Sequence, residues 1–277
     1  MNYFDHFRVV PGSKVKLNDI DPGFKGRHDR HKDAVEEIEQ DQQKLLQLQE
    51  LLYADHQCSL LICLQGMDTS GKDGTINHIL GAMNPQGCRV VGFKQPSAQE
   101  LAHDFLWRIH QAAPASGSVA IFNRSQYEDV LVVRVHDLVP KSIWSSRYDQ
   151  INAFEKELAA EGTHILKFYL HISKEEQLSR FEERLDDPAK QWKISEADYK
   201  ERKFWDDYTE AYEDALSRCS TDAAPWFVIP SNHKWFRNLA VARIVVEHLE
   251  ALGLKLPQSS VNLEQIRREY HAAKEAG

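Results

Sequence analysis

The chain has 277 residues and a formal net charge of −8. Its length is sufficient for one large α/β domain with extensions. The acidic balance argues against a general nucleic-acid-binding protein, although a local cluster of Lys and Arg could still attract an anion. The sequence contains no run of about 18 apolar residues, so no transmembrane helix is expected. Residues 1–6 (MNYFDH) lack the basic and apolar parts of a secretory signal, and the four cysteines lack metal-ligand spacing. We therefore expect a cytoplasmic protein with reduced thiols.

The N-terminal part, residues 1–54, is predicted to be an extension followed by a helix. Its first 30 or so residues are polar and contain turn signals, so we expect them to wrap the surface. A helix then follows, because its apolar residues are spaced to line one face. These residues are Val35, Ile38, Leu45, Leu48 and Leu52.

Strands and helices are predicted to alternate along the rest of the chain. Short apolar runs predict strands at 59–65, 88–93, 118–122, 164–172 and 226–230. Helices are expected at 75–80, 97–110, 141–160, 174–185, 195–216 and 235–252. This alternation predicts one α/β domain, residues 1–277, with a parallel sheet covered by helices on both faces. Residues 255–277 are expected to form a polar tail with a peripheral helix over 261–273.

The most informative segment, residues 66–74, reads GMDTSGKDG and lies between the first expected strand and helix. A Gly-rich loop in this position is typical of phosphate binding, because backbone N–H groups, a helix N-terminus and a lysine converge on an anion. The common motif has Ser or Thr after the lysine to hold Mg²⁺, but here Asp73 follows Lys72. Another carboxylate, Asp68, lies inside the loop. The predicted phosphate-binding residues of the loop are Gly66, Ser70, Gly71, Lys72, Asp73 and Gly74.

The acidic residues near the third strand suggest how a metal ion could be held. P-loop kinases usually place an acid at the end of the neighbouring strand. Here that position is Asn123, and Asp129 follows a few residues later. One or two carboxylates together with phosphate oxygens are enough for Mg²⁺. We hypothesise that Asp68 and Asp129 bind Mg²⁺, for which Mn²⁺ could substitute. The alternative is that Asp68 caps the loop and Asp129 lies on the surface.

Cations after the fourth strand predict a lid over residues 173–195. Arg180 and Arg184 are four residues apart, so they share a helix face, and Pro188 ends that helix. Lys190 and Lys193 follow, and all four could neutralise phosphate charge. A solvated helix face with glutamate partners is the alternative.

Further candidates lie at the carboxyl edge of the predicted sheet, where ligands of such sheets bind. Lys94 follows the second strand and Arg124 follows the third, so both are expected to contact phosphate, together with Arg108. His103 and Trp107 are equally well explained as a packed helix face. Ser125 with a histidine could suggest a hydrolase, but nothing in the sequence supplies an orienting acid or an oxyanion loop.

These motifs, in this order, strongly resemble the polyphosphate kinase 2 family. The resemblance runs from about residue 3 to residue 254 and includes 66–74 (GMDTSGKDG), 93–97 (FKQPS), 105–108 (FLWR), 123–129 (NRSQYED) and 180–193 (RFEERLDDPAKQWK). It implies a thymidylate-kinase-like, three-layer P-loop kinase fold with a five-stranded parallel sheet and a helical lid. It also implies reversible, Mg²⁺-dependent transfer of a terminal phosphate from inorganic polyphosphate to a nucleotide, without a covalent phosphoenzyme. The implied catalytic residues are Asp68, Lys72, Arg124, Arg180 and Arg184.

The resemblance also bears on the acceptor nucleotide. The segment Tyr127-Glu128-Asp129 resembles members that accept both AMP and ADP, whereas diphosphate-preferring members tend to carry Asn where Glu128 stands. Many members have Asp where this chain has Asn123. We therefore predict conversion of AMP to ADP and of ADP to ATP, with Tyr127, Glu128 and Asp187 as nucleotide-binding residues. The implied partners are polyphosphate, adenine or guanine nucleotides, and further copies of the chain in a homodimer or homotetramer.

Two other functions remain open. An ATP-dependent nucleoside monophosphate kinase could use the same fold, although Asp73 in place of Ser or Thr argues against it. A non-catalytic polyphosphate-binding protein is the second. Binding alone does not need the metal carboxylate Asp68, so its presence favours an enzyme.

Overall fold

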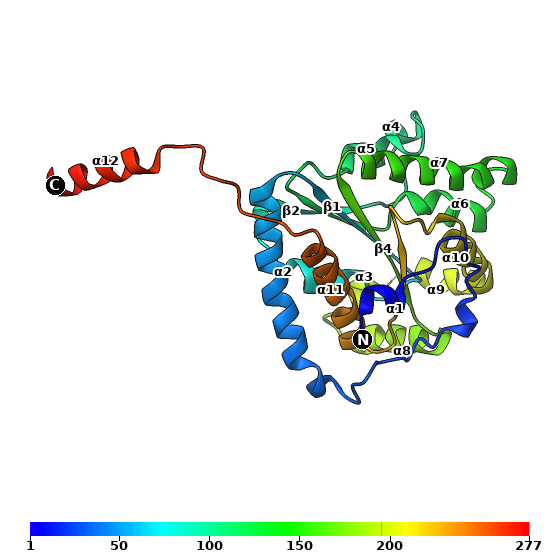
Figure 1. Ribbon diagram of the computed structural model, residues 1–277. Coiled ribbons are helices and arrows are strands. Elements are labelled where there is room, and N and C mark those ends of the chain that lie inside the picture. Colours follow the sequence, from blue (N-terminus) through cyan, green and yellow to red (C-terminus); the bar gives the residue numbers. More distant parts are fainter. Residues whose placement is uncertain (195, 277) are drawn as a thin grey trace.

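A computed structural model describes residues 1–194 and 196–276. Its centre is one five-stranded parallel sheet with the strand order β2-β3-β1-β4-β5 (Figure 1). The strands are β1 (Ser59–Gln65), β2 (Cys88–Gly92), β3 (Val119–Asn123), β4 (Thr163–His171) and β5 (Trp226–Pro230). Every residue of β1 is buried, as expected for a strand covered on both faces. The predicted five-stranded parallel α/β fold is confirmed.

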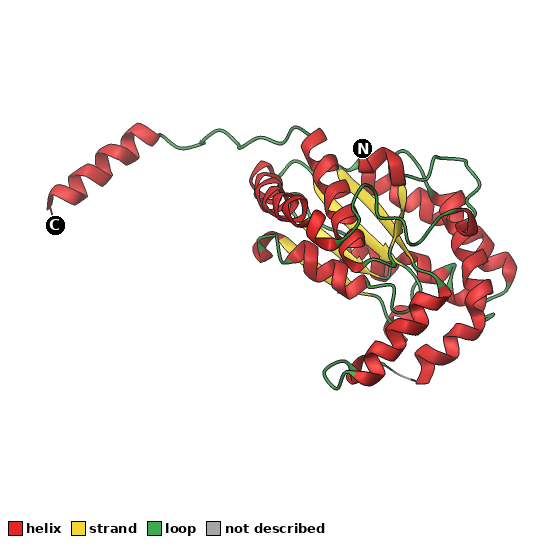
Figure 2. Ribbon diagram, turned by 90° about the horizontal axis from the view of Figure 1, so that it is seen from below, coloured by secondary structure: helices red, strands yellow, loops and turns green. Residues whose placement is uncertain are grey.

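Helices cover both faces of this sheet, which gives three layers (Figures 1 and 2). One layer contains α2 (Val35–Asp55), α3 (Lys72–Leu80) and α11 (Lys234–Ala251), and the other contains α5 (Trp107–Ala112), α7 (Lys141–Ala160) and α10 (Trp205–Cys219). Alternate residues of β1 explain why: Leu60 and Ile62 pack into the core under the first layer, whereas Leu61 and Cys63 pack under the second.

Two segments that were each predicted to form one continuous helix are interrupted in the structure, so these two predictions are wrong. The segment 97–110 divides into α4 (Ala98–Leu101), which begins with the expected capping box at Ser97, and α5, because Asp104 caps a turn between them. The segment after the lid divides into α9 (Glu196–Glu201), the 3-10 turn Arg202–Phe204 and α10. The lid region itself contains α8 (Lys174–Asp186) and the turn Gln191–Lys193.

The two ends of the chain differ in how they pack against the rest of the protein. The N-terminal segment is more buried than predicted, because Tyr3 and Phe7 of α1 (Tyr3–Phe7) pack with Phe236 of α11. The C-terminal helix α12 (Leu263–Ala276) stands away from the body in both views (Figures 1 and 2). Within residues 1–194 and 196–276, no helix has the length and apolar character needed to cross a membrane.

Candidate functional site

The phosphate loop joins β1 to α3 at the carboxyl edge of the sheet, as predicted from its sequence. Gly66 has a φ of +151°, and a Cβ there would lie 2.7 Å from Ser70 Oγ and 2.8 Å from the Leu170 carbonyl oxygen. Gly71, with a φ of +102°, directly precedes α3. A side chain at either position would therefore disturb the turn that directs the backbone N–H groups of the loop and of the helix N-terminus toward an anion.

Three side chains from α8 and α11 donate hydrogen bonds to the backbone carbonyl oxygens of the loop. Arg180 of α8 donates to the carbonyl oxygens of Thr69 (2.9 Å) and Ser70 (3.0 Å). Gln177, one turn earlier on α8, donates to the Asp68 carbonyl oxygen at 2.9 Å. Arg237 of α11 also donates to the Ser70 carbonyl oxygen, at 3.2 Å. These bonds fix the loop against two helices that lie more than 100 residues away in sequence.

The position of Arg180 differs from the prediction that it faces the transferring phosphate. Its exposure is only 4%, and its remaining donors bind Glu176 and the carbonyl oxygens of Ser231 and Asn232. With all these donors used, Arg180 supports the loop from within the protein.

Lys72 is folded back onto the loop. Its Nζ donates to the carbonyl oxygens of Gly66 (2.7 Å) and Met67 (3.2 Å). Burial and the nearby Arg124 lower the pKa of Lys72 to about 8. An ammonium group that binds only carbonyl oxygens in a buried loop is well suited to exchange them for phosphate oxygens.

Arg124 links the loop to the end of β3. Its guanidinium contacts Asp68 Oδ1 and Glu128 Oε2, each at 3.0 Å. Glu128, together with Asp68, raises the pKa of Arg124, so the guanidinium stays protonated. Gln65, the last residue of β1, donates to Ser125 Oγ and Glu128 Oε1 and thereby orients this group.

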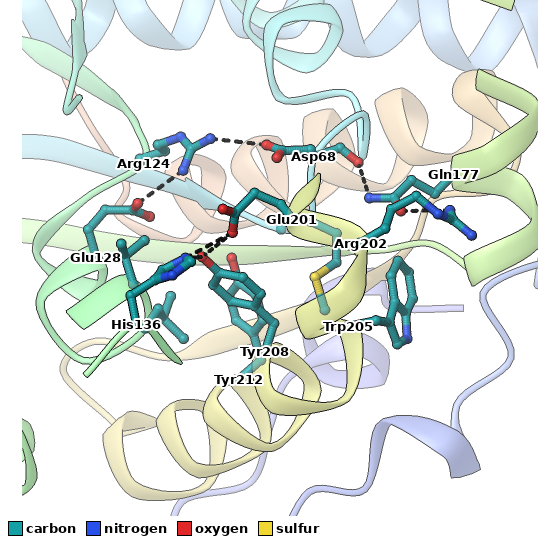
Figure 3. Close-up of a pocket in the computed structure, with 14 residues that line it drawn as sticks. Asp68, Arg124, Glu128, His136, Gln177, Glu201, Arg202, Trp205, Tyr208 and Tyr212 are labelled. Atoms are coloured by element: carbon teal, nitrogen blue, oxygen red, sulfur yellow. Dashed lines mark hydrogen bonds and ion pairs between the residues drawn. The ribbon is translucent and has the colours of Figure 1, made fainter. Parts of the chain in front are cut away.

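A pocket of about 220 Å³ opens beside this cluster (Figure 3). On one side it is lined by Gly66, Asp68, Arg124 and Glu128, and on the other by α6 (Val132–Val135) and α10 with the turn before it. The side chains that line the second side are largely aromatic or charged: His136, Glu201, Arg202, Trp205, Tyr208 and Tyr212. A pocket with aromatic walls and a charged end beside a phosphate loop has the composition expected for a nucleotide.

The far wall of the pocket is held by a hydrogen-bonded group. Glu201 Oε2 lies 3.0 Å from His136 Nε2 and accepts a bond of 3.0 Å from the Tyr208 hydroxyl. Figure 3 shows these three side chains meeting opposite the Arg124–Asp68 pair. Burial raises the pKa of Tyr208, so its hydroxyl stays protonated and can donate. These wall residues were not predicted, because their chain segments carry no motif and reach the loop only through the fold.

Tyr127 and Asp129 are predicted site residues that lie away from this pocket. Tyr127 is fully buried, and its hydroxyl donates to Glu155 and accepts from Lys167, so it does not line the pocket. The carboxylate of Asp129 contacts Arg147 at 3.0 Å and Arg108 at 3.8 Å. No contact joins Asp129 to Asp68 among the described side chains, so metal binding by Asp129 would require these ion pairs to open.

The other predicted cations are spread along the same edge. Buried Arg108 donates to the Lys94 carbonyl oxygen at 2.9 Å, so it positions the segment that carries the exposed Lys94. In the lid region, Arg184 donates to the Lys193 carbonyl oxygen. Lys190 pairs with Asp187 at 2.8 Å. Arg184 and Lys190 therefore bind groups within the lid region itself, and the lid cations do not line the pocket.

The loop offers a suitable set of oxygens for a metal ion and a phosphate. The hydroxyls of Thr69 and Ser70 are buried and have no hydrogen-bond partner among the described residues. The carboxylate of Asp68 belongs to the same loop, and Asp73 accepts a bond of 2.9 Å from Asn123 at the end of β3. Described residues contain no cluster of three or more His, Cys, Asp or Glu side chains suited to a metal. One carboxylate with hydroxyl and phosphate oxygens fits Mg²⁺, which rarely uses an all-protein site.

Comparison with known proteins agrees with this geometry. The family model for "Polyphosphate kinase 2 (PPK2)" matches residues 27–256. The chain belongs to the polyphosphate kinase 2 family.

Individual relatives match nearly the whole chain. An "AMP/ADP-polyphosphate phosphotransferase" of Meiothermus ruber is 49% identical over 94% of this chain and 98% of its own length. An "ADP-polyphosphate phosphotransferase" of Rhodopseudomonas palustris is 43% identical over 92% of each chain. The crystal structure of polyphosphate kinase 2 from Arthrobacter aurescens TC1 superposes with a TM-score of 0.94 at 41% identity, covering 98% of this chain and 97% of the other. The resemblance and the fold class predicted from the sequence are therefore confirmed.

Proposed function

We propose that this member of the family transfers the terminal phosphate of inorganic polyphosphate to AMP and to ADP, reversibly and with Mg²⁺, or Mn²⁺ in its place. The names of the Meiothermus ruber and Rhodopseudomonas palustris relatives support the reaction class. The observation that carries the proposal is the pocket itself, because it opens onto the phosphate loop where Asp68 and Arg124 meet. Donor and acceptor could thus meet at that pair.

In this proposal the loop binds the end of the donor chain. The N-terminus of α3 and the ammonium of Lys72 would neutralise donor phosphates, after Lys72 leaves the carbonyl oxygens that it now contacts. Asp68 would hold the metal ion, which supplies positive charge to the phosphate oxygens during transfer. Lys94, Arg184, Lys190 and Lys193 keep their predicted role as contacts for the rest of the donor chain.

The acceptor would occupy the aromatic pocket. Its base would lie among Trp205, Tyr208 and Tyr212, and its terminal phosphate would approach Arg124. An oxygen of that phosphate forms a bond to the terminal phosphorus of the donor, while the bond from this phosphorus to the bridging oxygen breaks. The shortened chain leaves with that oxygen. Arg124, at the junction of loop and pocket, would stabilise charge on the transferring group.

A donor and acceptor matrix tests the proposal. Purified protein with Mg²⁺ is incubated with AMP or ADP and with polyphosphate or ATP as donor, and nucleotides are separated by ion-exchange chromatography. We expect ADP and ATP from AMP, and ATP from ADP, with polyphosphate. Formation of ATP from ADP with no conversion of AMP would contradict the dual-acceptor assignment. Turnover of AMP with ATP alone would favour a nucleoside monophosphate kinase, and no turnover at all would favour a binding protein.

Two finer points belong to the same proposal. We propose adenine as the base, with guanine as a second possible base, and competition between AMP and GMP in the same assay measures the preference. We also propose a homodimer or homotetramer. The exposed apolar side chains of α12, Leu263, Ile266 and Tyr270, support this assembly, because they have no cover within the described chain. Light scattering after gel filtration gives the mass, and a monomer would refute the assembly.

A further inference from the structure

Arg237 is a buried cation that the sequence did not single out and that the proposed reaction does not use. It belongs to the first turn of α11 and is 3% exposed. Its Nη1 donates to the Ser70 carbonyl oxygen, and its Nε and Nη2 donate to Asn238 Oδ1 at 3.1 Å and 2.8 Å. All of these acceptors are neutral oxygens. In the described part of the chain, no carboxylate pairs with Arg237.

In lacking a counter-ion, Arg237 differs from Arg243 and Lys167, two other cations that are partly or fully buried. Arg243, six residues later on α11, donates from Nε to both carboxylate oxygens of Asp41 at 2.8 Å. Lys167, which is fully buried, binds Glu155. Burial and the neighbouring Arg180 lower the pKa of Arg237 to about 9, so the group is still charged at neutral pH. An unpaired buried charge destabilises a fold unless something offsets it.

The guanidinium of Arg237 lies against the backbone that forms the phosphate site. A Cβ added at Gly71 would lie 1.7 Å from its Nη1, and one added at Gly74 would lie 3.0 Å from its Nη2. The group therefore fills the space directly beneath the first turn of α3, where backbone N–H groups are expected to bind phosphate. Glycines at 71 and 74 are what allow it to come so close.

We propose that Arg237 is a buried counter-charge for the phosphate chain, a positioning residue that attracts the anion through one layer of backbone without touching it. The anion supplies the negative charge that Arg237 lacks. This inference rests on the proposed function only in that phosphate binds at the loop. It predicts that removing the charge weakens phosphate binding, and that the loss follows the charge and not the stability of the fold.

The test measures the Kd of inorganic tripolyphosphate by titration calorimetry for the wild type and for charged and neutral variants. Arg237→Met and Arg237→Gln remove the charge, and the glutamine keeps a donor for the Ser70 carbonyl oxygen. We expect both to raise Kd about tenfold or more, which corresponds to about 1.4 kcal/mol for each factor of ten. Arg237→Lys keeps the charge and should stay within about threefold of the wild type.

Urea unfolding of the ligand-free variants separates this role from a structural one. Arg243→Met is the matched control, because it lies on the same helix and leaves Asp41 without its partner. It should lower stability and leave Kd unchanged. If Arg237→Gln keeps the wild-type Kd, or if Arg237→Lys loses affinity as much as the neutral variants, the proposal is wrong. If the wild type does not bind tripolyphosphate, both this inference and the donor site of the proposed function are overturned.

Discussion

Replacing Gly71 by alanine should damage the phosphate loop for two separable reasons. The first is backbone strain, because Gly71 has a φ of +102°, a left-handed conformation that costs an alanine about 1–2 kcal/mol. The second is steric, because the new methyl would lie 1.7 Å from Arg237 Nη1. The guanidinium would have to move away from the Ser70 carbonyl oxygen, and an unsatisfied buried donor costs about 1–3 kcal/mol. Together these effects predict a loss of roughly 2–5 kcal/mol in the free energy of unfolding.

Two other glycines isolate the two contributions. Gly92 has no positive φ and nothing within 4 Å of an added Cβ, so Gly92→Ala should change stability little. Gly253 has a φ of +63° but also open space around it, so Gly253→Ala should show the backbone cost alone. Urea unfolding followed by tryptophan fluorescence compares the three variants. If Gly71→Ala loses no more stability than Gly253→Ala, the steric argument, and with it the placement of Arg237 beneath the loop, is refuted.

Three further predictions concern single side chains. Because phosphate binds the protonated ammonium and the pKa of Lys72 is lowered to about 8, tripolyphosphate binding should take up protons and weaken as the pH rises through 8. Calorimetry in buffers of different ionisation enthalpy measures this uptake, and a pH-independent Kd would contradict it. Chelation by EDTA should abolish turnover, and Asp68→Asn should raise the Mg²⁺ concentration for half-maximal rate; an unchanged Mg²⁺ dependence would count against Asp68 as a ligand. Lys167→Met should lower the free energy of unfolding by about 3–5 kcal/mol, because it leaves the buried carboxylate of Glu155 without its counter-ion. In the double variant with Glu155→Leu much of this loss should be recovered, and a single-variant loss below about 1 kcal/mol would exclude a strongly coupled pair.

The sequence predicted the parts of the molecule whose physics is local. Strand, glycine loop and helix N-terminus are adjacent in the chain, so residues 66–74 could be assigned from their order and spacing alone. The five strands were found for a similar reason, since each is a short apolar run. The helices around Asp104 and Phe204 were less well predicted, because a single cap or turn interrupts a continuous amphipathic pattern there.

The same reasoning could not tell on which side of the loop a side chain would lie. Arg180 and Arg184 share one face of α8, yet Arg180 reaches the loop carbonyl oxygens from below and Arg184 binds the Lys193 carbonyl oxygen. The periodicity of a sequence shows which residues share a helix face, but it does not show which other elements that face contacts. The pocket wall from Glu201 to Tyr212 and the cation Arg237 depend on contacts across most of the chain. For Gln177 a weak signal existed, because it lies one turn before Arg180.

The direction of α11 has a practical consequence for handling the protein. Because α11 follows a parallel strand and runs back along the sheet, it ends at Ala251 on the edge opposite the phosphate loop. The exposed chain and α12 then lead farther from the body (Figure 1). An affinity tag, a fluorescent reporter or a solid support attached beyond α12 would therefore sit remote from the pocket. Immobilisation through that end should leave the entrance to the pocket open to long polyanionic substrates.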